Sequence, residues 1–130
     1  MSNEQNTVEN WHKAFGAPVA DAPTLIPGAR SRLRHDLIAE ELEEYATAVW
    51  SDDIVEIADA LGDLLWVVYG TAAEHGIDLD PVFEEIARSN FSKLGADGQP
   101  IFRFDGKILK GPHYFEPELA HILREQGAQL

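Results

Sequence analysis

The stretch EIADALGDLLWVVYG, residues 56–70, decides how this chain folds. When these residues are placed on a helix at about 100° per residue, the apolar side chains from Ile57 to Ala73 cover almost the whole circumference. A helix that is apolar nearly all round is a largely buried one. We therefore expect this segment to lie inside a helical bundle.

The acidic residues of this helix form one narrow stripe, made of Glu56, Asp59, Asp63 and Glu74. Asp59 and Asp63 lie one turn apart on it. Solvated like charges at this spacing cost a few tenths of a kcal/mol per pair, whereas uncompensated ions inside a bundle cost several kcal/mol each. The stripe is therefore either the outer face of an acidic helical hairpin or a site where a cation compensates the charges.

The segment AEELEEY, residues 39–45, places a second acidic arc on the preceding helix. Glu40, Glu41 and Glu44 share their side of the helix with apolar residues, whereas Glu43 points outward. Two such helices joined by a short turn pack side by side, so the acidic arcs can face each other. Mg²⁺ is a hard cation that binds carboxylate oxygens and recruits substrate phosphates. We expect Mg²⁺ here, with Mn²⁺ as the alternative ion.

Start and stop signals divide the chain into helices. We expect helices over residues 6–15, 29–50 and 54–75, with capping residues at 51–53 and stops at Gly16 and Gly76. Asp80 as N-cap and Pro81 predict a further helix that ends at Gly95. Residues 101–110 surround Asp105-Gly106 and predict a short β-ribbon, and residues 118–126 a last short helix. The fold class is all-α, a four-helix core completed by oligomerisation, with a C-terminal β-ribbon.

Length and charge narrow the classes of function. The 130 residues predict a single domain over residues 1–130, with a net charge of -13, only 10 Lys and Arg, and no Cys. This acidity disfavours nucleic acid polymers and anionic membranes, so a phosphate-bearing ligand needs a metal ion as intermediary. The N-terminal residues lack a signal-peptide pattern, and no charge-free run is long enough for a membrane span. A cytoplasmic location is the default expectation.

The chain resembles the MazG-like, all-α nucleoside triphosphate pyrophosphohydrolases, a superfamily that includes phosphoribosyl-ATP pyrophosphohydrolase and the dimeric dUTPases. The resemblance rests on EELEE, EIADALGDLLWVVYG and IDLDPVFEEIARSNFSKL, and extends to WHKAFG and DGKILKGPHY. It implies hydrolysis of a nucleotide between its α and β phosphates, which gives a monophosphate and pyrophosphate. It also implies assembly as a homodimer or homotetramer, often with sites lined by both chains.

The family motif is Glu-Glu-x-x-Glu on one helix and Glu-x-x-Asp on the next, all binding magnesium. Glu40, Glu41 and Glu44 match the first half, and Asp63 matches the final Asp. The sequence departs from the motif at Ala60, where the family has Glu. The resemblance therefore implies that Asp59 or Glu56 supplies the fourth ligand. Glu40, also a candidate metal ligand, is the candidate base that accepts the proton of the attacking water.

Cations and amides near the end of the chain are the candidate substrate contacts. Asn90 and Lys93 match family positions that touch substrate, and Lys107 and Lys110 lie on the tail that follows. Each has a structural alternative, a helix cap for Asn90 and a solvated surface for the lysines. Aromatic residues that could stack on a nucleobase, or simply pack in the core, are Trp11, Trp50, Trp66 and Tyr69.

Two readings from other classes compete with the pyrophosphohydrolase. A di-iron bundle needs two Glu-x-x-His motifs, and only Glu118 to His121 provides one. An acidic helical module that binds a partner protein without catalysis is the other alternative. Within the enzyme class, a phosphoribosyl-nucleotide is the alternative substrate to a nucleoside triphosphate, because the sequence does not fix the base or sugar.

Overall fold

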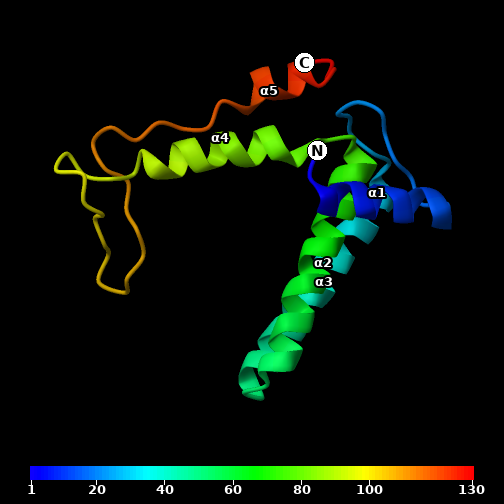
Figure 1. Cartoon of the computed structure of the whole chain (residues 1–130), viewed down its shortest axis with the longest axis horizontal. Helices are drawn as coiled ribbons and strands as arrows, with labels where there is room; N and C mark the ends of the chain where they lie inside the picture. The colour runs from blue at the N-terminus through cyan, green and yellow to red at the C-terminus, as the bar shows by residue number, and fades with distance from the viewer.

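The computed structural model describes residues 1–130 as five α-helices joined by loops, without a β-sheet (Figure 1). The helices are α1 (Asn3–Phe15), α2 (Gly28–Trp50), α3 (Ile54–His75), α4 (Leu79–Phe91) and α5 (Leu119–Glu125). α2 and α3 form a long antiparallel hairpin, and α1 lies across its open end (Figure 1). The all-α class and the central hairpin are confirmed. None of the helices combines the length and apolar composition needed to cross a membrane.

Local signals set the ends of the hairpin helices as the sequence predicts. The Asp53 carboxylate accepts hydrogen bonds from the backbone N–H groups of Val55 and Glu56, at 3.0 and 3.2 Å, and so starts α3. Gly76 ends α3 with φ of 70°, where a side chain would also collide with the carbonyl of Ala22. Both the left-handed backbone and the close approach require glycine at this position.

A buried ion network holds the open end of the hairpin together. The Glu74 carboxylate accepts two hydrogen bonds from Arg30, both at 2.8 Å, and lies 3.1 Å from Nη1 of Arg34. Arg34 also donates to the Val67 carbonyl at 2.9 Å. A Cβ at Gly70 would lie 2.5 Å from Nη2 of Arg34, so this glycine makes room for the guanidinium. The network ties α2 to α3 through the buried side chains of Glu74 and Arg34, with Arg30 partly exposed beside them.

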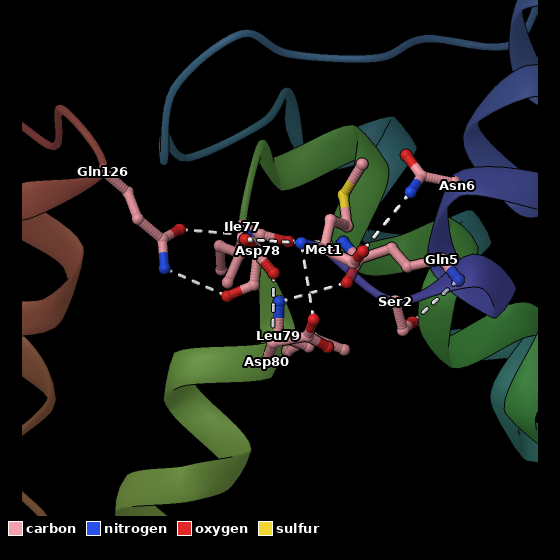
Figure 2. Close-up of polar contacts among 9 residues, drawn as sticks. All are labelled: Met1, Ser2, Gln5, Asn6, Ile77, Asp78, Leu79, Asp80 and Gln126. Carbon is pink, nitrogen blue, oxygen red and sulfur yellow. Dashed lines mark hydrogen bonds and ion pairs between the residues drawn. The ribbon is translucent and has the colours of Figure 1, made fainter.

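Polar side chains also fix the corner between α3 and α4 (Figure 2). Gln5 of α1 donates to the Ile77 carbonyl at 2.7 Å and accepts from Leu79 N–H at 3.1 Å. The Gln126 side-chain amide likewise accepts from Asp78 N–H at 2.9 Å and donates to the Asp78 carbonyl at 3.0 Å. Two amides from opposite ends of the chain therefore satisfy the backbone groups of this corner.

The predicted limits of α4 are wrong at both ends. Asp78, not Asp80, is the N-cap, because its side chain accepts from Asp80 N–H at 3.0 Å. The helix stops at Phe91 instead of continuing to Gly95. There, Ser92 Oγ donates to the Ser89 carbonyl and accepts from Phe115 N–H. The Lys93 carbonyl accepts from Gly111 N–H at 2.8 Å, so the returning tail binds a backbone group that a longer helix would have used.

The predicted β-ribbon is also wrong as a strand pair. Only one antiparallel bridge forms, between Phe102 and Ile108. The chain does reverse here, but Gly106 N–H closes the turn on the Arg103 carbonyl at 2.9 Å, one residue earlier than a turn centred on Asp105-Gly106. Phe104 is 99% exposed, and Phe102 and Ile108 are more than half exposed. An isolated two-stranded hairpin without a packed face is marginally stable in water, which explains the loss of regular strands.

One chain does not complete the expected four-helix core. Helix α4 runs away from the hairpin with α5 beside it (Figure 1), and only 12 of the 130 residues are buried. A chain of this length usually buries about two thirds of its unfolded surface. Leu42, Leu61 and Leu65 of the hairpin are each about half exposed. The core completed by a second copy stays a prediction.

Replacement of Glu74 by Gln should strongly destabilise the fold. The Glu74 side chain is fully buried, so the substitution leaves two arginines without their counter-charge. We expect the free energy of unfolding to fall by about 3 kcal/mol in urea denaturation. The matched control is Asp36→Asn on α2, whose carboxylate is 63% exposed and should matter by less than about 0.5 kcal/mol. Equal urea midpoints for Glu74→Gln and the wild type would contradict a structural role of the network.

Candidate active site

Three carboxylates from α2 and α3 converge in the half of the hairpin nearer its turn. One oxygen each of Glu41, Glu44 and Asp63 lies within 4.8 Å of the other two. Glu41 is partly buried, whereas Glu44 and Asp63 are exposed. Helical spacing places Glu41 and Glu44 about one turn apart on α2, and the antiparallel hairpin brings Asp63 opposite them. We call these three residues the carboxylate cluster.

The cluster is electrostatically strained. Burial, the hydrogen bond with Glu44 and the neighbouring carboxylates raise the pKa of Glu41 to about 6. Burial, followed by the charges of Asp59 and Glu44, raises the pKa of Asp63 as well. Oε2 of Glu41 is buried without a hydrogen-bond partner, which is costly for an acceptor atom. These features indicate that the cluster lacks a positively charged partner.

The donor set fits a hard divalent cation. The converging atoms are all carboxylate oxygens, and histidine and cysteine contribute none. Mg²⁺ and Mn²⁺ prefer such oxygen ligands, and Mg²⁺ keeps several of its waters when one or two carboxylates bind it. Glu41, Glu44 and Asp63 are the residues that could hold the ion, and the unpartnered oxygen of Glu41 is the donor that most needs it.

A groove of about 560 Å³ extends from the cluster toward the turn of the hairpin. Glu44 belongs to both the cluster and the groove. The other groove residues are mostly polar: Glu43, Thr47, Ala48, Ser51, Asp53, Glu56, Asp59 and Ala60. The groove therefore provides open space lined by acceptors directly beside the cluster.

The groove shows where the second half of the acidic motif lies. Ala60, which stands where the family motif has Glu, is only 2% exposed and offers no carboxylate to the groove that it lines. Asp59 and Glu56 instead line the groove, and the Asp59 charge acts on Asp63. Glu40 is exposed, and its charge contributes to the raised pKa of Glu41. Three further acidic residues thus lie around the carboxylate cluster without belonging to it: Glu40, Asp59 and Glu56.

The predicted substrate contacts lie elsewhere in the chain. Asn90 and Lys93 line a small, mainly apolar hollow of about 240 Å³ at the end of α4. Lys107 lies on the tail beyond it, and Lys110 Nζ stacks over the Tyr114 ring at 4.7 Å. Figure 1 shows this end of α4 far from the hairpin. A single chain does not bring these four residues to the carboxylate cluster.

The aromatic candidates occupy different places. Trp11 and Trp66 lie together on α1 and α3 with ring centroids 5.8 Å apart, and both are partly exposed. Trp50 is 91% exposed at the end of α2, and Tyr69 lies in the corner between α3 and α4. Among the histidines, buried His12 bonds the Pro18 carbonyl at 3.0 Å, while His121 pairs with Glu125. No histidine joins the cluster.

Sequence reasoning missed several residues that shape the groove. Glu43 is exposed as predicted, but it lines the groove together with Thr47, one turn further along α2. Ser51 and Asp53 belong to the turn, and the sequence predicts only a capping role for them. In the structure they also line the groove. The signal that could have identified them is the short turn itself, which brings the last turn of α2 beside the first turn of α3.

Comparison with known proteins identifies the family. A sequence model of the phosphoribosyl-ATP pyrophosphohydrolase family matches residues 8–90, which is more than half of the chain. The chain belongs to this family. The matched region includes the carboxylate cluster and ends at Asn90, before the tail.

Two relatives illustrate the range of this similarity. The uncharacterized protein L479 of Acanthamoeba polyphaga mimivirus is 51% identical over 49 residues, which are 38% of this chain and only 20% of the viral protein. A crystal structure from Exiguobacterium sp. 255-15, titled a "putative NTP pyrophosphohydrolase", is 28% identical. That similarity covers 96% of this chain and 94% of the other, with a TM-score of 0.46.

The raised pKa of Glu41 predicts how stability depends on pH. This pKa is about 6 in the folded chain and ordinarily 4.5. The folded state therefore favours protonated Glu41, and the stability that this proton contributes is lost as the pH rises through 6. Without divalent ions, the free energy of unfolding of the wild type should fall when the pH is raised from 5 to 7. We expect this fall to be about 1 kcal/mol larger in the wild type than in Glu41→Gln. At pH 7, millimolar Mg²⁺ should restore stability in the wild type only.

Urea unfolding at pH 5 and 7, in EDTA and in Mg²⁺, measures both effects. Glu4→Gln, which changes an exposed glutamate in the first turn of α1, is the charge-matched control and should follow the wild type. Parallel pH profiles for the wild type and Glu41→Gln, with the same response to Mg²⁺, would contradict the proposed electrostatics.

Proposed function

We propose that this chain is a Mg²⁺-dependent nucleotide pyrophosphohydrolase, which cleaves the α–β phosphoanhydride to give a nucleoside monophosphate and pyrophosphate. The observation that carries the proposal is the carboxylate cluster, in which three like charges converge around a buried, unpartnered oxygen of Glu41. Family membership supports the same chemistry. An acidic surface for a partner protein would not need an oxygen buried without a hydrogen-bond donor.

Each acidic residue has a role in this mechanism. Glu41, Glu44 and Asp63 would hold the ion, and Asp59 or Glu56 would complete the set from the groove. The ion, when bound, neutralises phosphate oxygens and acidifies water in the groove. Glu40, exposed at the edge of the cluster, accepts the proton of the attacking water. The water oxygen forms the new P–O bond while the bridging P–O bond breaks, and pyrophosphate leaves.

A second copy of the chain would supply the cations. Four of the ten Lys and Arg residues lie in residues 93–110, together with only two acidic residues, Asp97 and Asp105. This segment is therefore basic in a chain of net charge -13, and α4 carries it away from its own hairpin (Figure 1). In a homodimer or homotetramer, α4 of one copy can place Asn90, Lys93, Lys107 and Lys110 at the acidic groove of another. The exposed leucines of the hairpin provide the surface for such assembly.

Membership of the phosphoribosyl-ATP pyrophosphohydrolase family supports one alternative substrate class, the phosphoribosyl-nucleotides. A phosphoribosyl-nucleotide such as phosphoribosyl-ATP carries the same triphosphate anhydride, so the cluster could serve it by the same chemistry. A nucleoside triphosphate remains the leading substrate class here, because the basic segment is short and a second phosphate group on the base side would need further cations.

Pyrophosphate release tests the proposal directly. Purified wild type should release pyrophosphate from at least one member of a panel of nucleoside triphosphates and phosphoribosyl-ATP with Mg²⁺, and not in EDTA. Glu44→Gln should lower kcat/KM at least about 100-fold because it removes a ligand of the ion. Glu40→Gln should lower kcat by about 100-fold or more, with the Mg²⁺ concentration dependence unchanged.

Glu4→Gln again serves as the control and should retain wild-type rates. Absence of turnover with every substrate, or turnover that survives Glu44→Gln, would refute the enzymatic assignment. Turnover that falls with Glu44→Gln but is unaffected by Glu40→Gln would remove Glu40 as the base and leave the metal site intact.

A further inference from the structure

A partly exposed aromatic surface lies where α1 crosses α3. Trp11 stacks on Phe15 with centroids 4.6 Å apart and an interplanar angle of 25°. Its other side meets Trp66 edge to face, at 5.8 Å and 83°. Trp11 is 40% exposed, Phe15 71% and Trp66 37%, so the three rings form a surface open to solvent. We call these three residues the aromatic platform.

Helical spacing places one ring of the aromatic platform, Trp66, beside the carboxylate cluster on α3. Trp66 follows Asp63 by three residues, and side chains at this spacing are neighbours on a helix, with Cβ atoms about 5–6 Å apart. Trp66 also lies two turns beyond Asp59, on the same side of α3. A molecule held at Asp63 by its phosphates could therefore reach the rings with its next chemical group.

Gly62 provides an opening at the same place. It precedes Asp63 and lies one turn before Trp66, and apart from its chain neighbours and the backbone of its own helix nothing lies within 4 Å of the position that its Cβ would occupy. Glycine in a helix interior is destabilising relative to alanine. At Gly70 the approach of Arg34 and His12 explains the glycine, but nothing in this chain approaches Gly62. The empty space beside Gly62 therefore suits a flat group that leans on the helix backbone.

We propose that Trp11, Phe15 and Trp66 form the binding surface for the nucleobase of the substrate, with Gly62 leaving room for the base beside α3. The proposal rests on the proposed function, since it uses the carboxylate cluster as the phosphate end of the site. Every nucleobase has a π-face, and base–aromatic stacking adds substantial affinity without reading the base sequence. The ligand is thus an aromatic heterocycle linked through a sugar to phosphate.

The test compares the ring residues with a tryptophan outside the platform. Trp11→Leu and Trp66→Leu should each raise KM for the nucleotide by about ten-fold while kcat changes by less than two-fold. Trp11→Phe, which keeps a ring, should recover most of the affinity. Trp50→Leu is the control, because Trp50 is 91% exposed at the far end of α2, and its KM should equal that of the wild type.

Binding without turnover gives an independent readout. Nucleoside 5′-monophosphate should quench the tryptophan fluorescence of the wild type and of Trp50→Leu, and much less that of Trp11→Leu and Trp66→Leu. Ribose 5-phosphate, which lacks a base, should quench none of them. Gly62→Ala should raise the melting temperature and raise KM, whereas Gly28→Ala, which also faces open space in a helix, should leave KM unchanged.

The outcomes separate this inference from the proposed function. If the enzyme turns over nucleotides and Trp11→Leu and Trp66→Leu keep the wild-type KM, the platform is refuted and the pyrophosphohydrolase stands. If these variants instead change the oligomeric state in size-exclusion chromatography, the rings belong to an interface between copies and the platform is also refuted. If no nucleotide is hydrolysed, the proposed function fails, while base-dependent quenching still decides whether the rings bind nucleobases.

Discussion

The repulsion between carboxylates of α2 and α3 is the constraint on which the rest of the structure depends. Three like charges meet near the turn of the hairpin, and one oxygen of Glu41 is buried without a partner. At the open end, Glu74 is compensated within the chain by Arg30 and Arg34. At one end of the hairpin the acidic charge is thus neutralised within the chain, and at the other end it is not. The compensated end holds the helices together, whereas no ion pair within the chain joins Glu41, Glu44 or Asp63 of the cluster.

The sequence predicted the elements whose signals are local. Helices α2 and α3 begin and end within a residue of the expected positions, because Asp53 and Gly76 act within one turn of the backbone. Helical periodicity and a short turn allowed the two acidic arcs to face each other, and the family resemblance selected Glu41, Glu44 and Asp63 within them, which the structure brings together. The start of α4 was misplaced because Asp78 and Asp80 are equally good caps, and amides distant in sequence, Gln5 and Gln126, complete the corner.

The features that could not be predicted depend on distant contacts. The buried position of Arg34 needs the space left by Gly70, and no periodic pattern reveals that the two meet. The ribbon around Gly106 has the turn residues of a hairpin but lacks a surface to pack on. Ala60 breaks the acidic motif, and the sequence alone leaves Asp59 and Glu56 as equal candidates for the fourth ligand. Both of them line the groove beside the cluster, so the candidate with the right position depends on the packing of the two helices.

The negative charge of the chain links the proposed metal ion to the proposed second copy, because both would supply positive charge to an anionic substrate. A chain of net charge -13 repels a polyphosphate, and the cluster itself is the most acidic part of the hairpin. A divalent ion reverses that repulsion locally, but it cannot neutralise every phosphate oxygen of a triphosphate. In the proposed assembly, residues 93–110 of a second copy would supply further positive charge, since α4 directs this segment away from its own cluster (Figure 1). Because the aromatic platform lies on α1 and α3 and the basic segment follows α4, the base and the outer phosphates would be bound by different parts of the fold. The substrate would then bridge two copies, and assembly would be a condition of catalysis, beyond its contribution to stability.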